Sequence, residues 1–265
     1  MTAAQTFLDR VHDLARIGSI QGHLGWDRET LMPRKGAAAR SDVLAWLAAE
    51  SHRRLVSEEF GALMSAVQDD AANDPDLAAT VREMSRRRDR AVLLPEDFVS
   101  EFARTRSLAQ GAWQDARAAS DFPAFAPHLE TLLSMTKERV RLLGHEGPTY
   151  DALLDEYEIG STMAGYDPMF AELKAHLVPL LARITEASAA RDLPSLPDGA
   201  RFPVADQIAF CERVSRAMGF DFDAGRMDAS AHPFSAGLWP GDTRFTTRFD
   251  ESDPFSCLYA VMHET

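Results

Sequence analysis

Cysteine, lysine and long apolar runs are all scarce in this sequence. The two cysteines, Cys211 and Cys257, lack C-x-x-C spacing and lie in apolar helical patterns, which predicts buried free thiols. No stretch approaches the roughly 18 apolar residues of a membrane-spanning helix, and no basic segment followed by an apolar run opens the chain. These shortages exclude a membrane partner, and we expect a cytoplasmic protein.

Positive charge is also in short supply. The chain has 28 basic residues against 41 acidic ones, which gives a formal net charge of −13, and lysine occurs only at Lys35, Lys137 and Lys174. The arginines are interleaved with acidic residues and form no basic stripe. Because such a surface repels phosphate backbones and anionic lipid headgroups, nucleic acid is excluded as a partner.

What is present is a helical pattern. The 265 residues are 45% hydrophobic, enough for one large domain or two small ones. Apolar residues at three- and four-residue spacing predict a mainly α protein. We expect helices from about residue 8, over 37–64, 76–93, from 95, over 121–144, 148–157, 168–190 with an interruption at Pro179, and 204–218. A proline-rich loop is expected over residues 192–203.

The pattern changes after residue 220. Glycine and proline break the helices, and residues 243–249 alternate with period two, which is the one convincing strand. Asp242, Arg244 and Thr246 share one face of it. This is either an amphipathic edge strand with its polar face in water, or a strand that binds extended peptide. We therefore describe residues 1–220 as a helical scaffold and 221–265 as loop, edge strand and final helix.

The last residues carry the sharpest chemical signal. Asp253 and Pro254 provide a cap and a first-turn proline for a helix that ends in His263-Glu264-Thr265. In H-E-x-x-H zinc peptidases two histidines bind one metal, and the glutamate between them is the general base. The second histidine would fall at position 267, so His263 is equally explained as a surface or core residue. His232-Pro233-Phe234 is either an exposed turn or a loop over a substrate cleft.

Two other features have a plainer explanation. A tryptophan between charges at a helix end, such as Trp26, is usually a packing anchor. The carboxylates of Asp155, Glu156 and Glu158 are typical of a solvated face in an acidic protein.

Several segments, taken in order, resemble the thermostable carboxypeptidase 1 family, also called the carboxypeptidase Taq family. The segments are Gly25-Trp26-Asp27-Arg28-Glu29-Thr30-Leu31-Met32-Pro33, Arg40 with Ser51-His52, Pro148-Thr149-Tyr150-Asp151-Ala152-Leu153-Leu154-Asp155-Glu156-Tyr157-Glu158, His232-Pro233-Phe234, Asp242-x-Arg244-x-Thr246, and Ser256 to Glu264. Together they cover nearly the whole chain, but only about the first half of a family member.

The resemblance implies a large helical domain of the neurolysin-like zinc peptidase type, with a small antiparallel sheet near the C-terminus. It also implies a butterfly-shaped homodimer that removes single amino acids from peptide C-termini. In that scheme His263 is the first ligand of zinc, or of another divalent metal such as cobalt, and Glu264 is the general base. His232, Asp242, Arg244 and Thr246 are the expected substrate-binding residues.

The position of the motif leads to an expectation about this 265-residue form. One imidazole at a helix end is too small a ligand set for a zinc ion, so we expect a truncated N-terminal portion of a metallocarboxypeptidase, inactive by itself and without bound metal. The alternative is a stand-alone helical dimerisation or interaction module without catalysis, because apolar faces left uncovered by a missing half attract partners.

Overall fold

The computed structural model describes residues 2–145, 149–191 and 196–265. The chain is mostly helical with a small three-stranded sheet near the C-terminus, as the sequence predicts. It forms two compact units, one of residues 1–135 and 201–265 and one of residues 136–200. None of the described helices is long and apolar enough to cross a bilayer.

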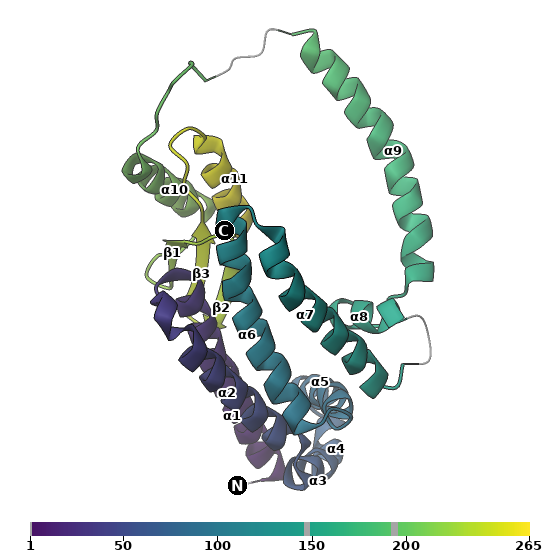
Figure 1. The fold of residues 1–265 in the computed structure, drawn as a ribbon. Coiled ribbons are helices and arrows are strands. Elements are labelled where there is room, and N and C mark those ends of the chain that lie inside the picture. The colour runs from purple at the N-terminus through teal and green to yellow at the C-terminus, as the bar shows by residue number, and fades with distance from the viewer. Residues whose placement is uncertain (1, 146–148, 192–195) are drawn as a thin grey trace. The chain divides into compact units, whose positions relative to one another are not determined.

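The first unit contains most of the elements (Figure 1). Its helices are α1 (Ala3–Thr30), a 3-10 turn η1 (Arg34–Gly36), α2 (Ala37–Val56), α3 (Glu58–Ala66), α4 (Gln68–Ala71), α5 (Pro75–Ala91), α6 (Glu96–Ala119), the start of α7 (Phe122–Leu142), α10 (Val204–Met218) and α11 (Pro254–Glu264). Its strands are β1 (Gly225–Ala229), β2 (Ser235–Trp239) and β3 (Asp242–Thr247).

Capping residues set several of these boundaries. Thr2 begins α1 by accepting a hydrogen bond from Gln5 N at 3.1 Å, and Asp74 begins α5 in the same way. The single helix predicted over residues 37–64 is wrong, because the chain turns at Ser57 with extended backbone angles. Ser57 ends α2 and caps α3 by accepting from Phe60 N at 3.2 Å, a competing local bond that helical periodicity does not reveal.

The core at the N-terminal end is built by α1, α3, α4 and α5. Phe7 and Phe60 are both nearly fully buried, with ring centroids 5.7 Å apart, and Val67 and Leu77 pack in the same cluster. Burying apolar area of this kind contributes about 25 cal/mol per Å², the main stabilising term for such a cluster. The amphipathic spacing of the sequence therefore becomes one packed helical core.

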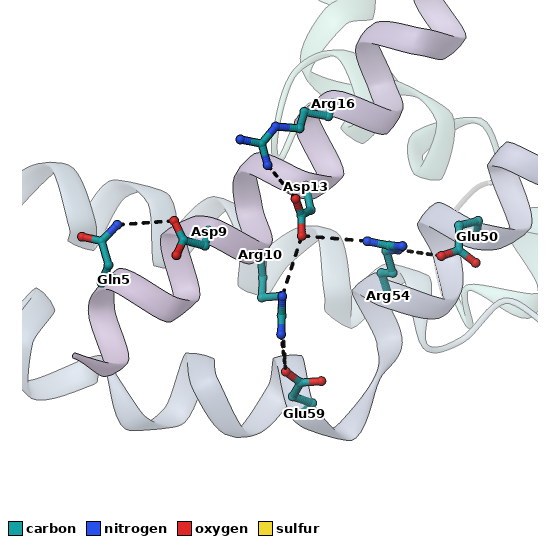
Figure 2. Close-up of polar contacts among 8 residues, drawn as sticks. All are labelled: Gln5, Asp9, Arg10, Asp13, Arg16, Glu50, Arg54 and Glu59. Atoms are coloured by element: carbon teal, nitrogen blue, oxygen red, sulfur yellow. Dashed lines mark hydrogen bonds and ion pairs between the residues drawn. The ribbon is translucent and has the colours of Figure 1, made fainter. Parts of the chain in front are cut away.

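Outside this core, charged side chains join α1 to α2 and α3. Asp13 lies between Arg16, Arg10 and Arg54, and Arg54 also pairs with Glu50 (Figure 2). Arg10 extends the chain of ion pairs to Glu59 at 3.1 Å. Because these side chains are partly exposed and screened by water, each pair adds little stability and mainly orients the helices.

The sheet is mixed, with strand order β1-β3-β2. β2 pairs with β3 antiparallel through the tight turn at Pro240 and Gly241, where Gly241 has a φ of +83°. β1, however, pairs with β3 parallel, so the expected antiparallel sheet is corrected to a mixed one. β3 is the central strand and not the predicted edge strand. β1 and β2 are short, contain glycine and show little alternation of polar and apolar residues. The sequence pattern therefore predicted only β3, the strand with which both of them pair.

The second unit contains the end of α7, α8 (Thr149–Tyr157) and α9 (Met163–Ala189). An ion pair of 2.7 Å between Arg139 and Glu156 joins α7 to α8. Asp151, which is 8% exposed, accepts from Met163 N at 2.8 Å and so joins α8 to the start of α9. The predicted break at Pro179 is wrong, since both Pro168 and Pro179 lie inside α9. The predicted start at Pro148, and part of the loop expected over residues 192–203, lie outside the described residues.

Candidate functional site

The final helix α11 carries the predicted His263 and Glu264. It begins as expected, since the Asp253 carboxylate accepts from the N–H groups of Phe255 and Ser256, both at 3.2 Å, and Pro254 occupies the first turn. Cys257 and Val261 form the buried stripe of the helix and pack with Cys211 and Phe245. The helix is therefore fixed against α10 and β3 along its inner face.

Polar contacts complete this attachment. The Thr247 hydroxyl donates to the carbonyl of Cys257 at 3.3 Å, which joins β3 to the middle of α11. At the C-terminal end, Thr265 Oγ1 lies 3.2 Å from Ser215 Oγ on α10. The two thiols lie 3.7 Å apart and are buried and free, which confirms the prediction for Cys211 and Cys257.

His263 and Glu264 thus lie in the last turn of an anchored helix. The His263 side chain is exposed and Glu264 is half-buried. Among the residues that the structure describes, no three His, Cys, Asp or Glu side chains gather closely enough to hold a metal ion. Because a protein zinc site needs three or four ligands, His263 and Glu264 fit one part of such a site and do not form the whole of it.

The other four predicted site residues gather on β3 and the loop before β2. Thr246 is fully buried, and its hydroxyl lies 2.6 Å from Ser230 Oγ and accepts from Phe234 N at 3.1 Å. The Ser230 hydroxyl also lies 2.6 Å from the carbonyl of His232. Thr246 therefore helps to hold the His232 loop on the sheet, and its part in substrate binding stays a prediction.

Asp242 and Arg244 face each other two residues apart on β3. Arg244 donates from Nε to Asp242 Oδ1 at 2.7 Å and from Nη2 to Oδ2 at 2.8 Å. The carboxylate also meets His23 of α1, whose Nε2 lies 3.1 Å from Oδ2. The hydrogen bond from Arg244, and to a lesser degree the contact with His23, lowers the pKa of Asp242 below its ordinary value.

Trp26 of α1 completes this cluster. It is 3% exposed, as expected of a packing anchor, and its ring lies 5.3 Å from the ring of Phe234. The Arg244 guanidinium lies 5.8 Å from the Trp26 ring centroid. Three sequence motifs far apart along the chain therefore meet: the tryptophan of the first, Phe234 of the second and Arg244 of the third.

His23 is the member that sequence reasoning missed. It lies 219 residues from Asp242, and no spacing rule links the two positions. Its approach to β3 is aided by the preceding residue, because a Cβ at Gly22 would lie 2.9 Å from Leu238 Cδ2 of β2. Gly22 in a helical segment indicates close packing of α1 against another element, but it does not identify β2 or Asp242 as the neighbour.

The His232 loop borders a hollow of about 500 Å³ on the α6 side. Its other lining residues are Arg106, Ala109, Gln110, Trp113, Phe125 and Leu132. Arg117 fixes the rim, since its guanidinium lies 5.2 Å from the Trp113 ring and donates from Nη1 to Ala231 O at 3.3 Å. His232 is exposed and also lines this hollow, so both interpretations of His232-Pro233-Phe234, an exposed turn and a loop over a substrate cleft, stay predictions.

The placement of β3 corrects one part of the expected chemistry. Both of its edges are occupied, by β1 and β2, so an extended peptide cannot add to β3 as a further strand. Contacts between β3 and a peptide are therefore limited to side chains such as Arg244, which is 20% exposed.

Comparisons with known proteins agree with these features. The model of the family described as Carboxypeptidase Taq (M32) metallopeptidase matches residues 6–265. Thermostable carboxypeptidase 1 of Thermus thermophilus is 34% identical over 274 residues, covering 99% of this chain and 53% of the relative. Thermostable carboxypeptidase 1 of Pyrococcus furiosus is also 34% identical and covers 94% of this chain and 50% of the relative.

Solved structures of carboxypeptidases are also similar to this chain. The crystal structure of BsuCP has a TM-score of 0.92 at 29% identity, covering 100% of this chain and 53% of the other. The M32 carboxypeptidase from Deinococcus radiodurans R1 has a TM-score of 0.83 at 34% identity and covers 52% of that chain. The chain spans about half the length of the relatives it matches. From the sequence motifs, the fold and these matches we conclude that the chain belongs to the Carboxypeptidase Taq (M32) metallopeptidase family.

Proposed function

We propose that this chain contributes one wall of the active site of a metal-dependent carboxypeptidase that releases C-terminal amino acids from peptides. The observation that carries the proposal is the attachment of α11 to β3, which puts His263 and Glu264 on the element next to Arg244. In this assignment His263 is a metal ligand and Glu264 is the general base. A bound zinc or cobalt ion would supply Lewis acidity and a more acidic water.

Arg244 is assigned to the peptide's terminal carboxylate. A guanidinium matches a carboxylate in charge and geometry, and Asp242 holds Arg244 through two hydrogen bonds while one nitrogen stays available. His232 borders the hollow beside this cluster, where it is placed to contact the peptide further from its end. Asp242 and Thr246 act by orienting Arg244 and the His232 loop.

We further propose that the 265-residue polypeptide by itself neither holds zinc tightly nor hydrolyses peptides, since His263 is the one assigned metal ligand and a protein zinc site needs three or four. Calorimetric titration with zinc and incubation with an N-blocked dipeptide test this. The expected result is weak binding that His263→Ala does not change, and no released amino acid with zinc or cobalt. Tight one-to-one binding that depends on His263, or hydrolysis that depends on Glu264, would contradict the proposal of inactivity.

The peptide-binding assignment has its own test. Titrating the chain with acetyl-alanyl-alanine and with the same peptide bearing a C-terminal amide separates carboxylate recognition from general peptide contact. We expect a preference for the free acid that is lost in Arg244→Ala and kept in Arg248→Ala, a matched and exposed arginine after the same strand. Equal affinity for both peptides would refute the role given to Arg244.

A second candidate is non-catalytic self-association, and α9 favours it. Phe170, Leu173, Leu177, Leu181 and Ile184 recur along one side of this helix and are each about half exposed or more. An exposed apolar stripe of this kind is typical of an interface. We propose a homodimer, to be tested by light scattering of the chain and of Leu177→Glu/Leu181→Glu. A monomer at all concentrations would refute it.

A further inference from the structure

His23 is held between two hydrogen-bond acceptors. Its Nδ1 lies 2.8 Å from the carbonyl oxygen of Ser19, one turn earlier in α1, and its Nε2 lies 3.1 Å from Asp242 Oδ2. A carboxylate only accepts, so in the contact with Asp242 the donor is Nε2–H. The imidazole therefore joins α1 to β3 through this hydrogen bond.

The same carboxylate oxygen serves two donors. Asp242 Oδ2 receives His23 Nε2 and Arg244 Nη2, while Oδ1 receives Arg244 Nε. Within the described part of the chain, Arg244 Nη1 makes no hydrogen bond. A side chain held at two of its nitrogens and against Trp26 loses little freedom when an acceptor binds the third.

The backbone of α1 brings His23 into this position. Gly22 allows α1 to approach Leu238 of β2, which is 7% exposed, so closely that a Cβ at this position would require the Leu238 side chain to shift. The contact between His23 and Asp242 is thus supported by packing on the adjacent residue, and it joins the N-terminal helix to the strand that carries the predicted substrate residues.

We propose that His23 is a positioning residue for peptide binding: by holding Asp242, it orients the Arg244 guanidinium so that Nη1 receives the terminal carboxylate of the peptide. The inference rests on the proposed function, because it takes Arg244 to be the carboxylate-binding group. His23 itself contacts neither the peptide nor a metal in this assignment, and acts through Asp242.

The first measurement observes the guanidinium directly. In the ¹⁵N-labelled 265-residue chain, the Arg244 Nε–H signal is assigned by its disappearance in Arg244→Lys, and its hydrogen-exchange rate is measured. Loss of one donor to Asp242 in His23→Ala should raise that rate by about threefold to tenfold. His23→Gln keeps a side-chain N–H for Asp242 and should restore most of the protection. His12→Ala, an exposed histidine on the same helix, is the matched control and should change nothing.

The second measurement is the preference for acetyl-alanyl-alanine over its C-terminal amide, followed by chemical-shift changes. His23→Ala should weaken binding of the free acid by about threefold and leave binding of the amide unchanged, with recovery in His23→Gln. A purely structural role for His23 would weaken both peptides equally and would not be rescued by glutamine.

The outcomes separate the inference from the function on which it rests. Unchanged Nε–H exchange and unchanged peptide preference in His23→Ala would overturn the inference, even where Arg244→Ala abolishes the preference and the proposed function stands. A peptide preference that survives Arg244→Ala would overturn the carboxylate role of Arg244 and the inference with it. If His23→Ala does not fold, as judged by loss of amide chemical-shift dispersion, His23→Gln is compared with the parent chain instead. Faster Arg244 Nε–H exchange together with a lost peptide preference in the folded glutamine variant would overturn the inference. Parent values of both quantities would uphold it.

Discussion

The backbone N–H of Phe234 donates to the hydroxyl of Thr246 at 3.1 Å, and the backbone N–H of Thr246 donates back to the carbonyl oxygen of Phe234 at 2.8 Å, so this pair helps to hold the His232 loop on the central strand. The hydroxyl is fully buried and also lies 2.6 Å from Ser230 Oγ. Loop and strand are therefore joined by a partly buried polar contact on a fully buried hydroxyl, which makes it costly to break.

Replacing Thr246 with valine tests this relationship. Valine keeps the shape and removes the hydroxyl, so the N–H of Phe234 and the Ser230 hydroxyl each lose a partner, and the free energy of unfolding should fall by about 1–3 kcal/mol. Urea denaturation measures the loss. Thr243→Val, at an exposed position of the same strand, is the control and should stay within about 0.5 kcal/mol of the parent. Equal effects of the two changes would contradict the assignment.

Gly225 should tolerate no side chain. A Cβ there would collide with the backbone carbonyl oxygen of Thr243 and lie 2.5 Å from Phe220 Cζ. Gly225→Ala should therefore force β1 away from β3 and destabilise the chain by roughly 1–3 kcal/mol in thermal or urea unfolding. The matched variant is Gly237→Ala on β2, where a Cβ meets open space and where we expect little change. A stable Gly225→Ala chain would show that β1 is not packed as described.

The carboxylate of Asp242 should make the folded chain less stable at acid pH. Its pKa is lowered in the folded chain, first by the hydrogen bond from Arg244, so its contribution is complete above the ordinary aspartate pKa of 3.8 and is lost as pH falls through the folded value. Comparing melting temperatures between pH 6 and pH 2.5 should show a smaller acid-induced loss in Asp242→Asn. Asp198→Asn, an exposed aspartate of the second unit, serves as the control. Identical acid profiles for the Asp242 variant and the parent would argue against the pairing.

The two thiols should be unreactive in the folded chain. Burial raises the pKa of Cys211 from 9.0 to about 12, with the neighbouring Cys257 adding to the shift. A raised pKa means that the unfolded chain ionises first, so the free energy of unfolding should fall as pH rises from about 9.0 towards 12. Labelling with a disulfide reagent at pH 8 should be slow and should become fast in denaturant. Rapid labelling of the native chain would show that the α10–α11 contact opens readily.

Much of the helical architecture follows from local sequence. Residues 204–218 were predicted to the residue, because an apolar stripe is followed by Gly219 with a φ of +103°. The cap at Asp253 was likewise visible from a short polar residue before proline. Predictions failed where a local pattern permits two outcomes: Ser57 divides a periodic segment, and α9 continues through Pro179.

For the candidate site, too, some features were predictable from the sequence and others were not. His263, Glu264, His232, Asp242, Arg244 and Thr246 were predicted through motifs that resemble those of a family, and their roles stay predictions. By itself the sequence determined the helical class and the capped final helix, because these depend on neighbours along the chain. Only the tertiary structure decided that β3 is central, that Thr246 is buried and that His23 meets Asp242, because pairing of strands and packing of α1 bring together groups that are separated by up to 219 residues.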